Sequence, residues 1–138
     1  MIEYRVTKKI YDNDLRPLYE SVGWSSYTNE LPDLSALITN SHLVISAWNN
    51  KQLIGLIRTV GDGVSIQYVQ DILVLPTYQN QGIGSNLFQQ VLEHSKNIRQ
   101  FVLMTDASVE NQATIKFYEK HGLRRFEDTQ ICGLWRMA

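Results

Sequence analysis

Two glycines, Gly82 and Gly84, stand at the start of a predicted helix, directly after an apolar strand and a short polar loop. Glycine lets the backbone approach a ligand closely, and the first amides of a helix lack partners within the helix. These amides also lie at the positive end of the helix dipole, which favours an anion such as a phosphate. The spacing alone fits equally well a turn whose glycine lets the helix pack closely on the strand.

Two common nucleotide-binding loops do not fit this stretch. A Walker loop requires Lys before its Ser or Thr, whereas Ser85 follows Gly84 directly. A dinucleotide fingerprint requires a small residue three positions after its second glycine, where this chain has Leu87. Asp106 lies at about the distance of the ribose-binding carboxylate of that fold, but the chain lacks the required series of βα units.

The composition is that of an ordinary globular protein. With 138 residues, 43% of them hydrophobic and 20% charged, we expect one domain over residues 1–138. The net charge of −1 argues against non-specific nucleic-acid binding, which needs a basic face. Cys132 is the only cysteine, which excludes an intrachain disulfide and fits a reducing compartment. Without a signal-peptide core or an apolar run of about 20 residues, we expect a soluble cytoplasmic protein and no membrane partner.

The elements that position the glycine loop follow from the hydrophobic periodicity and the turn residues. Helices are expected after Asp12 or Asp14, near Pro32, after the glycines and over residues 109–120. Strands are expected over residues 1–7, 42–48, 52–60, 64–75, 101–104, 123–127 and 131–136. This order predicts an α+β fold with one parallel crossover built around the glycine loop.

Two segments resemble one known family. The stretch from Gln79 to Gly84 resembles, at every fixed position, the Gln/Arg-x-x-Gly-x-Gly/Ala signature of the GNAT N-acetyltransferase superfamily. Residues 111–123 are similar to the family's Asn-x(6)-Tyr-Glu-Lys-x-Gly-Phe segment, with Leu123 in place of Phe and Thr114 in place of Ala. Both departures lie at packing positions. The predicted order of elements also agrees, so the resemblance covers essentially the whole chain.

The resemblance implies a mixed α/β fold with a mostly antiparallel, twisted sheet of about seven strands and four helices, splayed at the acetyl-coenzyme A site. It implies direct transfer of acetyl from acetyl-coenzyme A to an amine in a ternary complex, without a metal. The pyrophosphate would be held by Gln79, Asn80, Gln81, Gly82, Gly84 and Ser85. The pantetheine arm would pair with the backbone of Leu73, Val74 and Leu75, beyond a β-bulge near residues 69–71.

Catalytic roles follow from the same resemblance. Tyr118 occupies the position where the family often keeps a general acid, which would protonate the departing thiolate; the alternative is a core aromatic residue. A backbone amide near Val74 would stabilise the oxyanion. Asp71 is the candidate base or ammonium anchor, although a paired carboxylate, with water carrying the proton, fits as well. Asn111 would contact the coenzyme or, alternatively, bond the backbone at its own helix start.

The family usually roofs its acceptor site with the loop between the first two helices, which here carries Trp24 and Tyr27. Two aromatic rings with neighbouring serines suit a small amphipathic amine, or else form only a packing lid. Arg58 interrupts an otherwise apolar strand, and Arg binds a carboxylate with two parallel hydrogen bonds. That hypothesis makes the acceptor a free amino acid; the alternative for Arg58 is a structural salt bridge.

The sequence therefore predicts an N-acetyltransferase acting on the primary amine of a small molecule, with a free amino acid as one candidate. Acetylation of a protein N-terminus or lysine stays open, as does a coenzyme A sensor without catalysis; Tyr118 favours an enzyme. Homodimers are common in the family, and the two closing strands would form the contact. The sequence does not determine the acceptor, the general base or the acyl length.

Overall fold

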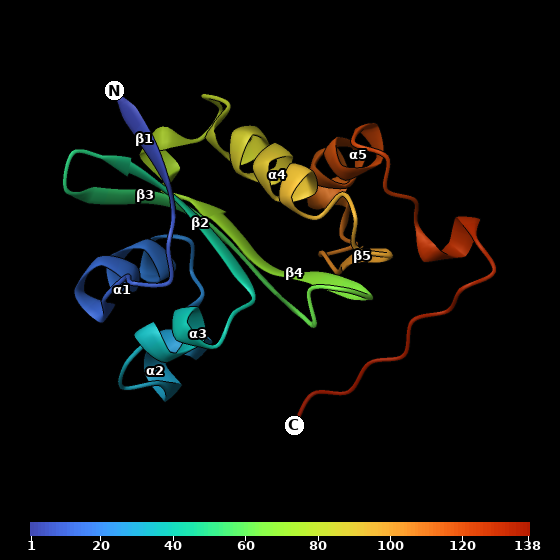
Figure 1. The fold of residues 1–138 in the computed structure, drawn as a ribbon, viewed down its shortest axis with the longest axis horizontal. Coiled ribbons are helices and arrows are strands. Elements are labelled where there is room, and N and C mark those ends of the chain that lie inside the picture. The colour runs from blue at the N-terminus through green and yellow to red at the C-terminus, as the bar shows by residue number, and fades with distance from the viewer. The chain divides into compact units, whose positions relative to one another are not determined.

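The computed structural model describes residues 1–138, which form two compact units, Met1–Leu103 and Met104–Ala138. The first unit contains the strands β1 (Ile2–Val6), β2 (Leu43–Asn49), β3 (Gln52–Gly61), β4 (Ile66–Val74) and β5 (Gln100–Leu103). Its helices are α1 (Asp12–Ser21), α2 (Ser25–Glu30), α3 (Ser35–Thr39) and α4 (Ile83–His94), with a 3-10 turn at Pro76–Tyr78. The second unit contains α5 (Gln112–Lys120) between 3-10 turns at Val109–Asn111 and Phe126–Asp128. Figure 1 labels these helices and strands.

The five strands form one sheet in the order β1-β2-β3-β4-β5. Neighbouring strands are antiparallel except for β4 and β5, which are parallel. Parallel neighbours need a crossover connection, and α4 supplies it between β4 and β5. The α+β fold with one parallel crossover after the glycine loop is therefore confirmed.

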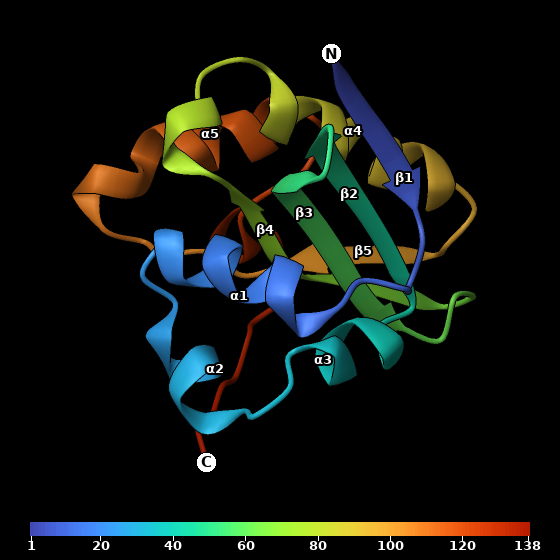
Figure 2. The same cartoon turned by 90° about the vertical axis from the view of Figure 1, so that its left-hand side faces the viewer.

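Helices cover both faces of the sheet. Figure 2 shows α1 and α3 in front of it and α4 behind. The core between α1, α3 and the sheet contains fully buried Leu15, Leu18, Ile38 and Leu56. On the α4 face, a Cβ on Gly55 would lie 3.1 Å from Ile83 Cγ2, so this glycine lets α4 approach the sheet closely.

A β-bulge interrupts the pairing of β3 with β4. Arg58 pairs with Asp71 and Thr59 pairs with Val69, so Gln70 is an extra residue on β4. This confirms the bulge expected near residues 69–71. Because β5 pairs with β4 only over Ile66–Val69, the last residues of β4 have no strand partner on that side. The sheet is splayed there, as the resemblance implies.

The prediction of seven strands and four helices was wrong in number, since the structure has five of each. The closing strands expected over residues 123–127 and 131–136 are absent, and a 3-10 turn occupies Phe126–Asp128 instead. An alternating apolar pattern forms a strand only beside a neighbouring strand, and Leu134 and Trp135 are 95% and 67% exposed. The extra helix is α2, in the segment expected to be a loop. No helix is long and apolar enough to cross a membrane.

Candidate functional site

At the splayed end of β4, alternate residues direct their backbone groups to the open side. The amide of Leu75 donates to the Ile54 carbonyl at 2.8 Å, so Leu75 bonds toward β3. Hydrogen-bonded and non-bonded pairs alternate along an antiparallel ladder, so Val74 directs its amide and carbonyl away from β3. The Val74 carbonyl accepts a hydrogen bond from Gln79 Nε2 at 3.0 Å. Among the predicted pantetheine residues Leu73, Val74 and Leu75, Val74 is therefore the one whose backbone faces the open edge.

The glycine loop has the backbone geometry of an anion site. Gly82 is the N-cap of α4 with φ of 82°, a left-handed conformation that favours glycine. Asn80 is also left-handed, with φ of 63°. The first bond of the helix runs from Asn86 N to Gly82 O at 3.0 Å, so the preceding amides, including those of Gly84 and Ser85, have no carbonyl acceptor within the helix. Gln81, in contrast, bonds its side chain to the Thr77 carbonyl.

A buried ion pair lies at the bulge. Arg58 and Asp71 are 6% and 2% exposed, and Arg58 Nε donates to Asp71 Oδ2. Tyr19, fully buried on α1, donates its hydroxyl to the same oxygen at 2.8 Å. Two donors on Oδ2 fix the orientation of the carboxylate and compensate its charge.

The other carboxylate oxygen is held weakly. Asp71 Oδ1 accepts one hydrogen bond, from the Tyr27 hydroxyl at 3.4 Å. That hydroxyl also accepts from Gln70 Nε2 at 3.3 Å and from Arg58 Nη2 at 3.5 Å. Arg58 Nη1 reaches Ser41 Oγ at 3.4 Å. Because these contacts are long, Oδ1 retains the capacity to accept a shorter hydrogen bond from a ligand.

A cleft of about 320 Å³ opens beside Asp71 and is lined by Gly23, Trp24, Ser26, Tyr27 and Asp71. The rings of Trp24 and Tyr27 meet edge to face with centroids 6.4 Å apart. Tyr19 lies 5.9 Å from Trp24 and 5.6 Å from Tyr27 between ring centroids. The structure thus brings together Trp24, Tyr27 and Asp71, three of the predicted site residues, with Arg58 behind Asp71.

Two groups that contact Asp71 keep their protons, Tyr19 and Arg58. Burial raises the pKa of Tyr19 far above its usual value, and the Asp71 charge raises it further, so its phenol remains a donor. Burial lowers the pKa of Arg58, but the Asp71 charge and hydrogen bond outweigh burial and raise it overall. Tyr19 was missed as a site residue, because its position on the apolar side of α1 predicts only a core role. A polar hydroxyl on a core ring was the signal available.

The second unit carries the two remaining predicted residues. Asn111 Nδ2 donates to the Thr105 hydroxyl at 2.9 Å and to the Asp106 carbonyl, so its side chain braces the loop before α5. Tyr118 on α5 is 7% exposed, and burial raises the pKa of its phenol. Its ring lies 5.4 Å from that of Phe117 between centroids.

The chain is similar to several known acetyltransferases. The family model described as Acetyltransferase (GNAT) family matches residues 7–123. A solved GNAT family acetyltransferase from Streptococcus pneumoniae TIGR4 is 32% identical, with a TM-score of 0.84 over 100% of this chain and 98% of that one.

Two relatives in sequence extend the comparison. An uncharacterized ycf52-like N-acetyltransferase from Prochlorococcus marinus is 30% identical over 88% of this chain and 67% of its own length. The histone acetyltransferase TAP1 of Glycine max is 30% identical over 79% of this chain and 50% of its own length, so the chain spans only half of that protein. With the family model covering most of the residues and a fold shared throughout, the chain belongs to the GNAT family of N-acetyltransferases.

Proposed function

We propose that this protein transfers an acetyl group from acetyl-coenzyme A directly to the primary amine of a small molecule held in the cleft beside Asp71. The observation that carries the proposal is that Asp71 lines this cleft beside Trp24 and Tyr27 and has one carboxylate oxygen that is only weakly held. The cleft volume of about 320 Å³ falls within the range of small-molecule sites. Asp71 lies on β4 three positions before Val74, whose backbone faces the open edge.

The donor side rests on two features of the backbone. The family uses acetyl-coenzyme A, and the free amides at the start of α4 suit its pyrophosphate. The pantetheine amides would pair with the open edge of β4, as an added strand does. The Val74 amide would then also donate to the acetyl oxygen as negative charge develops there.

On the acceptor side, Asp71 Oδ1 would accept a proton from the amine or anchor the ammonium. Arg58 would support Asp71 rather than bind the acceptor. Its Nε donates to the Asp71 carboxylate, and this bond compensates the charge of that carboxylate and orients it. Its other nitrogens make only long contacts, to Ser41 and Tyr27. A free amino acid would have to share this guanidinium, so we expect amines without a carboxylate to react faster.

A panel of acceptors tests the proposal by measuring thiol release from acetyl-coenzyme A. The panel contains alanine, phenylalanine and lysine, their decarboxylated counterparts ethylamine, 2-phenylethylamine and cadaverine, and a short peptide with a free N-terminus. We expect turnover of at least one small amine and its loss in Asp71→Asn. If the amino acids are acetylated faster than their decarboxylated counterparts, Arg58 binds the carboxylate of the acceptor. If none of the small molecules causes thiol release, the proposal is wrong.

Protein acetylation is the second candidate, because the soybean relative is named a histone acetyltransferase. The peptide in the panel tests this reading. Preferential acetylation of the peptide would support it. Measurable binding of coenzyme A with no turnover of any acceptor would instead support a sensor.

A further inference from the structure

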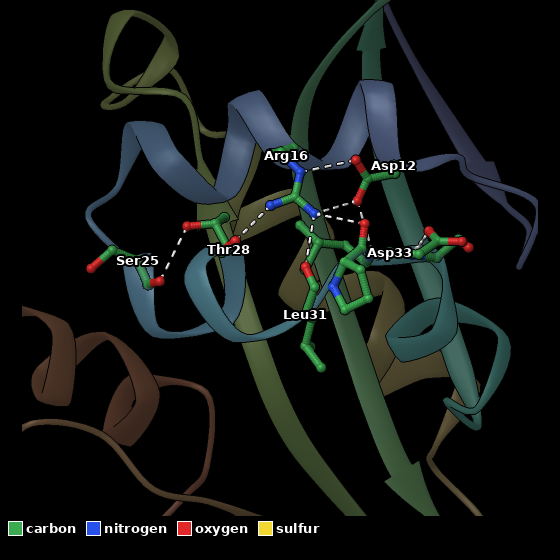
Figure 3. Close-up of polar contacts among 9 residues, drawn as sticks. Asp12, Arg16, Ser25, Thr28, Leu31 and Asp33 are labelled. Atoms are coloured by element: carbon green, nitrogen blue, oxygen red, sulfur yellow. Dashed lines mark hydrogen bonds and ion pairs between the residues drawn. The ribbon is translucent and has the colours of Figure 1, made fainter.

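An ion pair in the first turns of α1 is tied to the segment that roofs the cleft. Arg16 Nε donates to Asp12 Oδ2 at 2.9 Å, and Arg16 Nη2 donates to Asp12 Oδ1 at 2.8 Å. The two parallel bonds fix the plane of the guanidinium. Figure 3 shows this pair, hereafter the Asp12–Arg16 clamp, facing the α2 segment.

Arg16 also donates hydrogen bonds to backbone carbonyls of that segment. Its Nη1 donates to Thr28 O at 2.8 Å, and its Nη2 donates to Leu31 O at 3.0 Å and Pro32 O at 3.3 Å (Figure 3). Carbonyls at a helix C-terminus lack partners within the helix and favour a cation. Because α2 is short and has no fully buried residue, the bonds from Arg16 are an anchor for its C-terminal end.

Asp12 holds the other end of the same segment. Its Oδ1 accepts a hydrogen bond from the amide of Leu34, the N-cap residue of α3, at 2.8 Å. Asp12 therefore does not cap its own helix, whose N-cap is Tyr11 without a side-chain bond. The clamp thus fastens residues 28–34 at both ends to α1.

Tyr27, which lines the cleft, precedes Thr28 directly in the chain. The hydroxyl of Tyr27 has only long contacts, 3.3 Å to Gln70, 3.4 Å to Asp71 and 3.5 Å to Arg58. Neighbouring rings hold the Tyr27 side chain, whereas the shorter bonds of Arg16 fix the backbone that directly follows it. We propose that Arg16 is a positioning residue for acceptor binding, acting through Thr28 and Tyr27. This inference rests on the function proposed for the cleft.

The test is Arg16→Lys, which keeps the charge but loses the planar fork of donors. With the panel amine of highest kcat/KM as the probe, we expect its KM to rise roughly tenfold, because at least one charge-assisted bond is lost. The KM of acetyl-coenzyme A should stay unchanged, and kcat should fall less than the amine KM rises. Arg5→Lys is the matched control, since it alters another Arg–carboxylate pair, Arg5 with Glu3, away from the cleft lining.

Hydrogen exchange provides a readout that needs no acceptor. In Arg16→Gln we expect faster amide exchange in a peptide covering residues 24–34, with β2 and β3 unchanged. An unaltered exchange rate in that peptide, or an unaltered amine KM in Arg16→Lys, would overturn the role of Arg16. A rise in KM for both substrates would do the same, because it indicates a general structural loss. If the wild-type enzyme acetylates no amine, the proposed function fails while the exchange experiment still decides whether the clamp exists.

Discussion

The two carboxylate oxygens of Asp71 are held unequally. Oδ2 is occupied by Arg58 and Tyr19, whereas Oδ1 meets only the distant Tyr27 hydroxyl at the cleft. A buried carboxylate needs a partner for its charge, and a catalytic one needs a lone pair free for the substrate. The bulge at Gln70 satisfies both needs, because it places Asp71 opposite Arg58 while β4 continues to Val74.

The buried pair makes a stability prediction. Arg58→Met leaves the Asp71 charge unpaired, and we expect it to lower the free energy of unfolding by about 3–5 kcal/mol. Adding Asp71→Leu should recover most of this loss, because the unpaired charge is then removed. Urea denaturation of both variants provides the measurement. Equal stability of the single and double variants would show that the charge is not the cause.

Tyr118 makes a kinetic prediction at the same scale. If its phenol protonates the departing thiolate, Tyr118→Phe should lower kcat by roughly 10²–10⁴-fold. The dissociation constant of coenzyme A should hardly change, because the ring is retained. Burial raises the pKa of this phenol, so it is protonated at neutral pH as a general acid must be. Tyr11→Phe, at an exposed tyrosine, is the control. An unchanged kcat would show that Tyr118 is a packing residue and not the general acid.

At the scale of elements, the turn into α4 is set by Gly82. Because Gly82 has a φ of 82°, Gly82→Ala should cost about 1–2 kcal/mol of strain or shift the loop. We expect a higher KM for acetyl-coenzyme A and an unchanged KM for the amine. Gly122→Ala is the matched control, because Gly122 has a similar positive φ of 95°, an added Cβ there would meet nothing within 4 Å, and it lies outside the glycine loop. Similar effects of the two substitutions on the KM of acetyl-coenzyme A would show that general backbone strain, and not the loop, is the cause.

At the scale of the whole molecule, the core shared by α1 and the sheet makes stability depend on pH. Burial and Asp71 raise the pKa of Tyr19 above its usual 10.0, so the folded state keeps a proton that the unfolded chain releases. This contribution is complete below about pH 10 and is lost as the pH rises further. We expect the Tm difference between wild type and Tyr19→Phe to narrow above that pH. A constant difference across the alkaline range would contradict the linkage.

The local features of the fold were predictable because they depend on a few adjacent residues. The glycine loop, the following helix and the strand before it were all identified from period and turn residues. The strands expected over residues 42–48 and 52–60 form an antiparallel pair, and Asn50 in the turn between them has a positive φ of 54°. The prediction of the two closing strands was wrong because a strand forms only beside a neighbouring strand, which no local pattern specifies.

What the sequence determined by itself is the family and the strand, loop and helix around Gly82 and Gly84. The residues assigned to the donor and the acceptor stay predictions. Whether Arg58 meets a substrate or a carboxylate of its own chain was decided by strand register, which pairs it with Asp71. Tyr19 and Asp71 are 52 positions apart, and the Arg16 bonds to Thr28, Leu31 and Pro32 span 12 to 16. Side-chain partners so far apart in the chain depend on how α1 packs on the sheet and on α2. Backbone preferences are local, whereas the pairing of charges and hydroxyls in the cleft is a property of the packed tertiary structure.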